Sequence, residues 1–166
     1  MARQTFFSFH FERDVWRAGN VRNSWRFRKE ADRQDVGFWD AAAWEATKRQ
    51  GEEAVHKWID NQLKGTSVTV VLIGSETSER PYVGYEIKQS HSKGNGLLGI
   101  YIHNIRDDSG RTDPKGKNPF DSWWITHENG TKTYLSSIYR TFDWVNDNGR
   151  DNIGEWIEAA AARAGR

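Results

Sequence analysis

The chain has 166 residues, of which 36% are hydrophobic and 28% charged, and its formal net charge is +1. This length suits a single domain over residues 1–166, and the near-zero net charge argues against nucleic acid as a partner. There is no cysteine, which excludes disulfides and thiolate chemistry. No apolar run approaches the roughly 20 residues of a membrane helix, and the N-terminal apolar patch is too short for a signal peptide. The sequence therefore predicts a cytoplasmic protein that does not contact a membrane.

The first half of the chain alternates apolar segments with helical ones. An aromatic-rich strand is expected over residues 5–11, followed by a helix in "ERDVWRAGNVRNSW". The stretch "VRNSWRFRK" predicts a short second strand, and residues 30–46 are expected to be irregular or short-helical. Residues 51–64 predict an amphipathic helix, because their apolar side chains share one face.

The middle of the chain predicts a strand, a helix and a second strand. Residues 67–74 and 96–103 are near-continuous apolar runs, typical of strands that are covered on both faces. Between them, Pro81 suits the first turn of a helix that is expected to end at Gly94. Together with the alternating first half, this unit predicts an α/β fold with an open parallel sheet and helices on both faces.

The last third of the chain begins with a long polar loop over residues 106–122. Such loops are usually functional or mobile, so we expect residues 106–119 to be more mobile than the sheet. A late strand with a following turn is expected in "TKTYLSSIYRTFDWV", and a C-terminal helix in "GRDNIGEWIEAAAARAG".

Several patterns that suggest a cofactor or metal are explained without one. Residues 94–99, "GNGLLG", match the dinucleotide fingerprint, but they follow a helix and open a strand, which is the reverse of the order that binds pyrophosphate. The five histidines show no metal-ligand spacing, so no metal is expected. Most of the nine tryptophans are expected in the core, although one or two could stack on a flat ligand.

Polar side chains follow two strands that should end side by side. In a sheet of order 2-1-3-4-5, ligands bind where the ends of the strands at 5–11 and 67–74 flank the switch point. The side chains expected around this crevice are Phe9, His10, Arg13, Ser75, Glu76, Thr77 and Arg80. Tyr82 and Glu86 are four residues apart, so they share a helix face that can point into the crevice. Spacing alone leaves Glu86 open to a simpler interpretation, a solvated glutamate on an amphipathic helix.

A family resemblance is carried by "FFSFHFERD", "GTSVTVVLIGSETSERPYVGYEI", "GNGLLGIYIHNI" and "KGKNPFD". These stretches resemble the TIR-like branch found in Thoeris anti-phage defence, in its TIR-containing B component. The resemblance covers roughly residues 3–125 and implies a single TIR-like domain with a flavodoxin-like fold.

The resemblance also implies an activity. TIR enzymes cleave NAD at the nicotinamide–ribose bond, so NAD is a substrate here and no cofactor is expected. Glu86, four residues after Tyr82, matches the key catalytic glutamate; many members have tryptophan where this chain has tyrosine. In Thoeris the TIR protein responds to an unidentified phage-derived trigger and makes a cyclic ADP-ribose isomer, which activates a separate effector protein.

The chemistry fits these residues. Cleavage builds positive charge on the ribose, and nicotinamide leaves from a cationic ring, so one carboxylate suffices without a general acid. Phe9 could stack on a ring, and Arg13 or Arg80 could meet the pyrophosphate. A site closed against water would favour the cyclic product, with residues 106–120 as a candidate lid.

Two alternatives stay open. The first is a non-enzymatic TIR module that signals by assembly. The second is a flavodoxin-like nucleotide-binding domain, although a receiver domain would need an aspartate where the central strand ends in "IGSET". The sequence does not determine the product isomer, the trigger, or whether the protein is a homo-oligomer.

Overall fold

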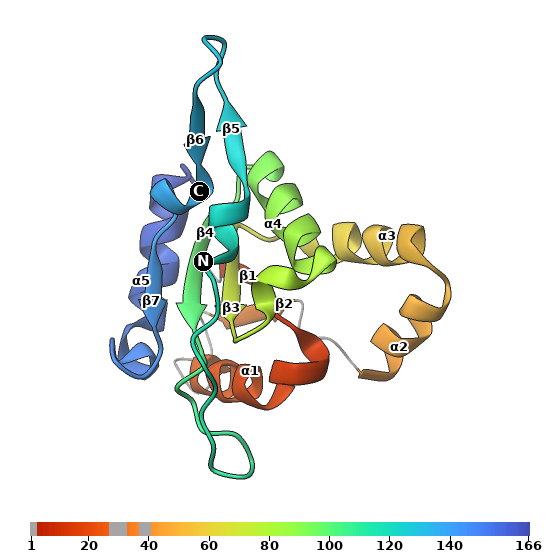
Figure 1. The fold of residues 1–166 in the computed structure, drawn as a ribbon, viewed down its shortest axis with the longest axis vertical. Helices are drawn as coiled ribbons and strands as arrows, with labels where there is room; N and C mark the ends of the chain where they lie inside the picture. The colour runs from red at the N-terminus through yellow and green to blue at the C-terminus, as the bar shows by residue number, and fades with distance from the viewer. Residues whose placement is uncertain (1–2, 27–32, 37–40) are drawn as a thin grey trace.

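A central sheet of five strands carries the fold (Figure 1). The structure is a computed structural model that describes residues 3–26, 33–36 and 41–166. The sheet order is β2-β1-β3-β4-β7, which is the predicted order with β7 in fifth place, and every pairing is parallel. The strands are β1 (Arg3–Ser8), β2 (Arg33–Val36), β3 (Val68–Ile73), β4 (Gly96–Tyr101) and β7 (Thr141–Asp143). The predicted α/β fold class is confirmed.

The composition of the central strand β3 explains its place in the middle of the sheet. All six of its residues are buried, as its near-continuous β-branched run predicts. Val70 pairs with Phe7 of β1 on one side and with Leu98 of β4 on the other. The carboxyl ends of β1 and β3 therefore lie next to each other at the same end of the parallel strands.

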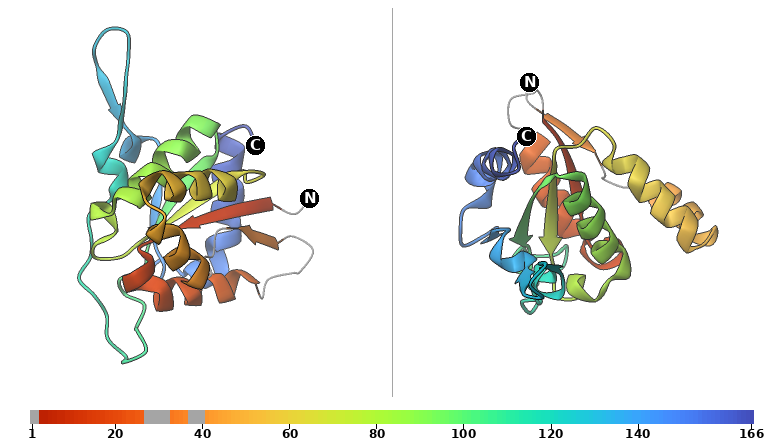
Figure 2. Two further views of the ribbon diagram at one scale, coloured as in Figure 1. Left: turned by 90° about the vertical axis from the view of Figure 1, so that its right-hand side faces the viewer. Right: turned by 90° about the horizontal axis from the view of Figure 1, so that it is seen from above.

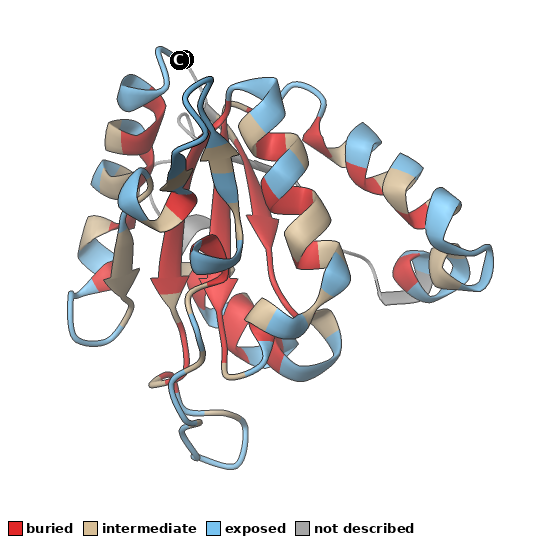
Figure 3. Ribbon diagram, turned by 45° about the horizontal axis from the view of Figure 1, so that its top comes forward, coloured by how far each residue is buried: buried red, intermediate tan, exposed pale blue. Residues whose placement is uncertain are grey.

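Helices cover both faces of the sheet, as Figure 2 shows from two further sides. Ala18 and Ile153, from two helices far apart in the chain, pack with Val70 on one face. Val83 and Ile87 pack with strand residues of the other face. The first face carries α1 (Phe11–Arg26) and α5 (Gly149–Arg163), and the second carries α2 (Ala41–Arg49), α3 (Glu52–Leu63) and α4 (Pro81–Lys93). The central strands are buried, whereas each helix exposes its outer side (Figure 3).

Two predictions for the first half were wrong in position. The first strand ends at Ser8 instead of continuing to residue 11, because the His10 ring accepts a hydrogen bond from the Arg13 amide at 3.1 Å and begins α1. The strand predicted in "VRNSWRFRK" is absent from its described part, since α1 continues to Arg26 with Val21 buried. Residues 27–29 of that stretch lie outside the described residues. The second strand of the sheet is β2 instead, inside the segment expected to be irregular.

The second half contains more strands than predicted. The stretch "TKTYLSSIYRTFDWV" forms two strands, β6 (Lys132–Tyr134) and β7, separated by a short 3₁₀ turn. An antiparallel hairpin joins β6 to β5 (Trp124–Thr126), and it projects from the end of the molecule opposite the loop after β4 (Figure 1). The predicted helices at 51–64, from Pro81, and at the C-terminus are confirmed. None of the helices in the described ranges is long and apolar enough to span a bilayer.

Candidate functional site

The inner face of α4 carries a glutamate that is cut off from solvent. The helix begins at Pro81, and Gly94 closes it with a left-handed φ of 82°. Glu86 lies on the face that α4 turns towards the sheet and is 0% exposed. Glutamate is almost never fully buried unless it is paired, so this position is unusual.

Ser8, the last residue of β1, is the polar neighbour of the Glu86 carboxyl. Ser8 is also fully buried. Within the described part of the chain, the two carboxyl oxygens of Glu86 make no hydrogen bond of strict geometry. The same holds for the Ser8 hydroxyl. Burial raises the pKa of Glu86 to about 8, and the Ser8 hydroxyl lies close enough to lower that pKa in part. Since a glutamate is almost never fully buried, a buried acid whose polar neighbour is one serine hydroxyl points to a functional role.

The raised pKa of Glu86 affects the charge of its carboxyl at neutral pH. Burial raises the pKa of Glu86 to about 8 and so favours its protonated form at neutral pH. A positive charge brought next to a carboxyl favours its ionised form and lowers its pKa. The Glu86 carboxyl is therefore suited to respond to a cationic group bound beside it.

A second group of side chains gathers around Arg13, in the first turns of α1. The Arg13 Nε donates a hydrogen bond to Ser75 Oγ at 2.9 Å, and its guanidinium lies 3.7 Å from Glu76. The same guanidinium reaches Asp113, at 3.3 Å, in the loop after β4. Arg13, Ser75 and Glu76 thus meet at the neighbouring ends of β1 and β3, as the sequence predicts.

His10 and Arg80 lie beside this group. His10 is largely buried, and burial followed by the positive charge of Arg80 lowers its pKa. Because its Nδ1 accepts from the Arg13 amide, the neutral ring carries its proton on Nε2. Arg80 lies 3.8 Å from Glu12, which also binds Lys48 of α2 at 2.7 Å. These contacts join the start of α1, the start of α4 and α2.

Two of the predicted substrate-binding residues pack in the interior. Thr77 is fully buried, and its hydroxyl accepts a hydrogen bond from the Gly74 amide at 2.8 Å, which fixes the turn after β3. Phe9 is 3% exposed and packs with Phe7 on the α1 and α5 face of the sheet, whereas Glu86 belongs to the opposite layer. Contact of either residue with a substrate stays a prediction.

Tyr82, at the start of α4, packs against an aromatic side chain of α2. Its ring meets the ring of Trp44 edge-on at 5.5 Å, and Trp44 lies 5.9 Å from Trp58. Trp44 comes from α2 and is almost fully buried. Whether Tyr82, Glu86 and the Arg13 group line one crevice also stays a prediction.

The sequence did not single out the residues that hold the loop after β4. Arg17, 4% exposed, donates hydrogen bonds to the carbonyl oxygens of Ile105 at 2.7 Å and Arg111 at 2.9 Å, and binds Asp113 at 3.0 Å. Asp14 is fully buried beside it, and burial raises its pKa to about 6. The sequence did carry a signal for their burial, because Asp14 and Arg17 fall on the same helix face as the buried Ala18 and Val21. Ser8 was missed because a serine in a strand carries no pattern of its own.

Comparisons with known proteins identify the family of the chain. The family model described as "Thoeris protein ThsB, TIR-like domain" matches residues 6–107, which include Ser8, Arg13 and Glu86. A protein of Bacillus cereus (strain MSX-D12), named "Putative cyclic ADP-D-ribose synthase ThsB1", is 34% identical over 193 aligned positions, which cover 95% of this chain and 100% of that relative. The resemblance found in the sequence is confirmed: the chain belongs to the ThsB family of TIR-like Thoeris proteins.

Proposed function

We propose that this protein cleaves NAD at the nicotinamide–ribose bond and closes the remaining ADP-ribose into a cyclic messenger. The observation that carries the proposal is the fully buried carboxyl of Glu86 on the inner face of α4, with its pKa raised by burial. The name of the Bacillus cereus relative, a cyclic ADP-D-ribose synthase, supports the choice of product class.

The first step requires one carboxylate. NAD brings a cationic nicotinamide ring, and a positive charge beside the Glu86 carboxyl favours its ionised form. When the bond between the ring nitrogen and the ribose breaks, its electron pair stays with nicotinamide, which leaves neutral. The positive charge moves to the ribose, where the Glu86 carboxylate stabilises it.

The second step decides between a cyclic and a linear product. A nitrogen or hydroxyl group of the same molecule attacks the ribosyl cation, forms the new bond and loses its proton if it carries one. Attack by water would instead give linear ADP-ribose. A site closed against water would favour attack within the molecule and so the cyclic product.

The charged residues around Arg13 have a supporting role in this proposal. A pyrophosphate would compete with Glu76 and Asp113 for the Arg13 guanidinium, which can bind two phosphate oxygens at once. Arg80 supplies a second positive charge beside His10. In this proposal the protein responds to a trigger of phage origin. Its cyclic product then acts on a separate effector protein.

Product analysis tests this proposal. Protein purified from phage-infected cells is incubated with NAD, and the products are separated by chromatography and identified by mass spectrometry. We expect loss of NAD, release of nicotinamide, and a product with the mass of cyclic ADP-ribose. Linear ADP-ribose as the main product would contradict the cyclase assignment. Unchanged NAD would contradict the enzymatic proposal and favour a module that signals by assembly.

A further inference from the structure

A cleft of about 490 Å³ lies on the outer side of α4, away from the face that carries Glu86. Its walls come from α4 and from the base of the β5–β6 hairpin, which is not part of the central sheet. Its volume falls within the range of clefts that bind small molecules, about 300 to 1,000 Å³. The lining residues are Lys88, His91, Ser92, Ser122, Trp123, Trp124, Ile125 and Leu135.

The lining residues favour one class of ligand. Trp123 and Trp124 both line the cleft and supply apolar aromatic groups, and Trp124 is 47% exposed. Lys88 and His91 contribute basic groups from α4, and none of the eight lining residues is acidic. Flat aromatic surface beside positive charge suits an aromatic molecule that carries a negative group.

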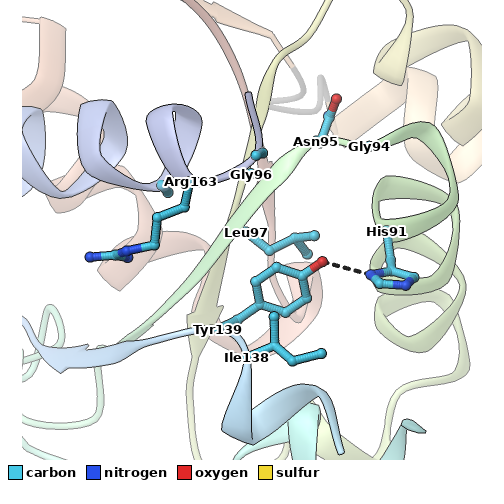
Figure 4. Close-up of a pocket in the computed structure, with 10 residues that line it drawn as sticks. His91, Gly94, Asn95, Gly96, Leu97, Ile138, Tyr139 and Arg163 are labelled. Carbon is cyan, nitrogen blue, oxygen red and sulfur yellow. Dashed lines mark hydrogen bonds between the residues drawn. The ribbon is translucent and has the colours of Figure 1, made fainter. Parts of the chain in front are cut away.

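The wall that His91 forms is held in place. Its Nδ1 is hydrogen-bonded to the Tyr139 hydroxyl at 2.6 Å, as the dashed line in Figure 4 shows. His91 also lines the neighbouring pocket drawn there, of about 320 Å³. A ring fixed in this way loses little conformational freedom when a ligand binds.

The cleft is in direct contact with the helix that carries the catalytic candidate. A Cβ atom at Gly84 would lie 2.8 Å from Cζ2 of Trp123, so only a glycine lets the indole lie this close to the backbone of α4. Gly84 precedes Glu86 by two residues, and Lys88 follows it by two. A ligand that displaces Trp123 or engages Lys88 therefore acts on the turns of α4 on both sides of Glu86.

We propose that this cleft is an effector site for a flat aromatic anion of nucleotide size, and that its occupancy is communicated to α4. The claim that the ligand regulates activity rests on the proposed function of Glu86. The claims that a ligand binds in the cleft and that it affects α4 are independent of that function.

Fluorescence titration tests the binding. The probe is anilinonaphthalene sulfonate, an aromatic anion, and its uncharged counterpart N-phenylnaphthylamine controls for the negative group. We expect saturable binding of the anion, about tenfold weaker after Trp124→Ala and about threefold weaker after Lys88→Gln. Trp16→Ala and Lys57→Gln are the matched controls, since Trp16 is 54% exposed on α1 and Lys57 is exposed on α3. Equal affinity in all variants, or tighter binding of the uncharged probe, would overturn the site.

Hydrogen exchange tests the coupling. With the sulfonate probe at saturation, we expect slower exchange of the amides of Val83–Ser90 and unchanged exchange in α3. If exchange in α4 stays the same while the probe is bound, the coupling is wrong. Neither experiment uses NAD, so failure of this inference and failure of the proposed enzymatic function are read out separately.

Discussion

The side chains of Glu86 and Ser8 form an arrangement that folding alone does not favour. Both are fully buried, and among the described residues the Ser8 hydroxyl is the group that acts on the pKa of the Glu86 carboxyl besides burial. An unsatisfied buried polar group costs about 1 to 3 kcal/mol, and a charged one costs more. Under the proposed function, the compensating benefit is a carboxyl placed to stabilise a cation.

The stability of the protein should reveal the raised pKa of Glu86. Its folded-state pKa is about 8, against 4.5 for the free side chain. Between these values the unfolded chain has lost the proton and the folded protein retains it, so this group lowers stability as pH rises, by about 1.4 kcal/mol per pH unit. We predict that Glu86→Gln gains stability relative to wild type by this amount per unit between pH 5 and pH 7. Urea unfolding at several pH values measures the difference, and parallel pH curves would show that Glu86 ionises normally.

Ser8→Ala tests the hydroxyl next to this carboxyl. The Ser8 hydroxyl lowers the pKa of Glu86, so its removal should raise that pKa further. We predict a lower rate of NAD processing at pH 7 and a pH–rate profile that moves to higher pH. An unchanged profile would remove Ser8 from the site. The smaller alanine side chain should leave the fold intact, which circular dichroism checks.

At the scale of the elements, close packing explains where helices and strands meet. A Cβ atom at Gly96, the first residue of β4, would lie 2.4 Å from the carbonyl oxygen of Ala160 in α5. We predict that Gly96→Ala destabilises the protein by about 1 to 3 kcal/mol, because the backbone of α5 must move. Gly19→Ala in α1 is the control, since nothing lies within 4 Å of its added Cβ. This control should be neutral or stabilising by up to about 1 kcal/mol, and a similar loss in both variants would contradict the packing argument.

The elements that the sequence predicted well are those with strong local signals. β3 and β4 are continuous apolar runs, and α4 has a proline at its start and a glycine after its end. β2 was placed wrongly because its four residues, "RQDV", contain one apolar side chain, so periodicity gives no signal there. β7 was merged with β6 because both are only three residues long.

At the scale of the whole molecule, the site is assembled from distant parts of the chain. The contact between Arg13 and Asp113 joins residues 100 positions apart. The sheet order could be predicted, and with it the meeting of Arg13, Ser75 and Glu76. The anchoring of the loop by Arg17 could not, because a buried arginine depends on carbonyl oxygens that only the folded chain brings together.

This anchoring makes a prediction about the loop after β4. Arg17→Met keeps much of the buried side chain but removes the cation and its hydrogen bonds. We predict faster hydrogen exchange in residues 106–119 and little change in Val70 to Ile73. Arg150→Gln, at an exposed position of α5, is the control. Equal exchange in the loop of all three proteins would show that Arg17 does not hold it.

The central claim is that the Glu86 carboxylate stabilises the ribosyl cation. The direct test is the rate of NAD processing by Glu86→Gln, compared with wild type and with Glu79→Gln, which changes an exposed glutamate just before α4. We predict that Glu86→Gln lowers the rate by about 100-fold or more while its cooperative thermal unfolding is retained, and that Glu79→Gln processes NAD like wild type. A folded Glu86→Gln protein with the wild-type rate would contradict the claim.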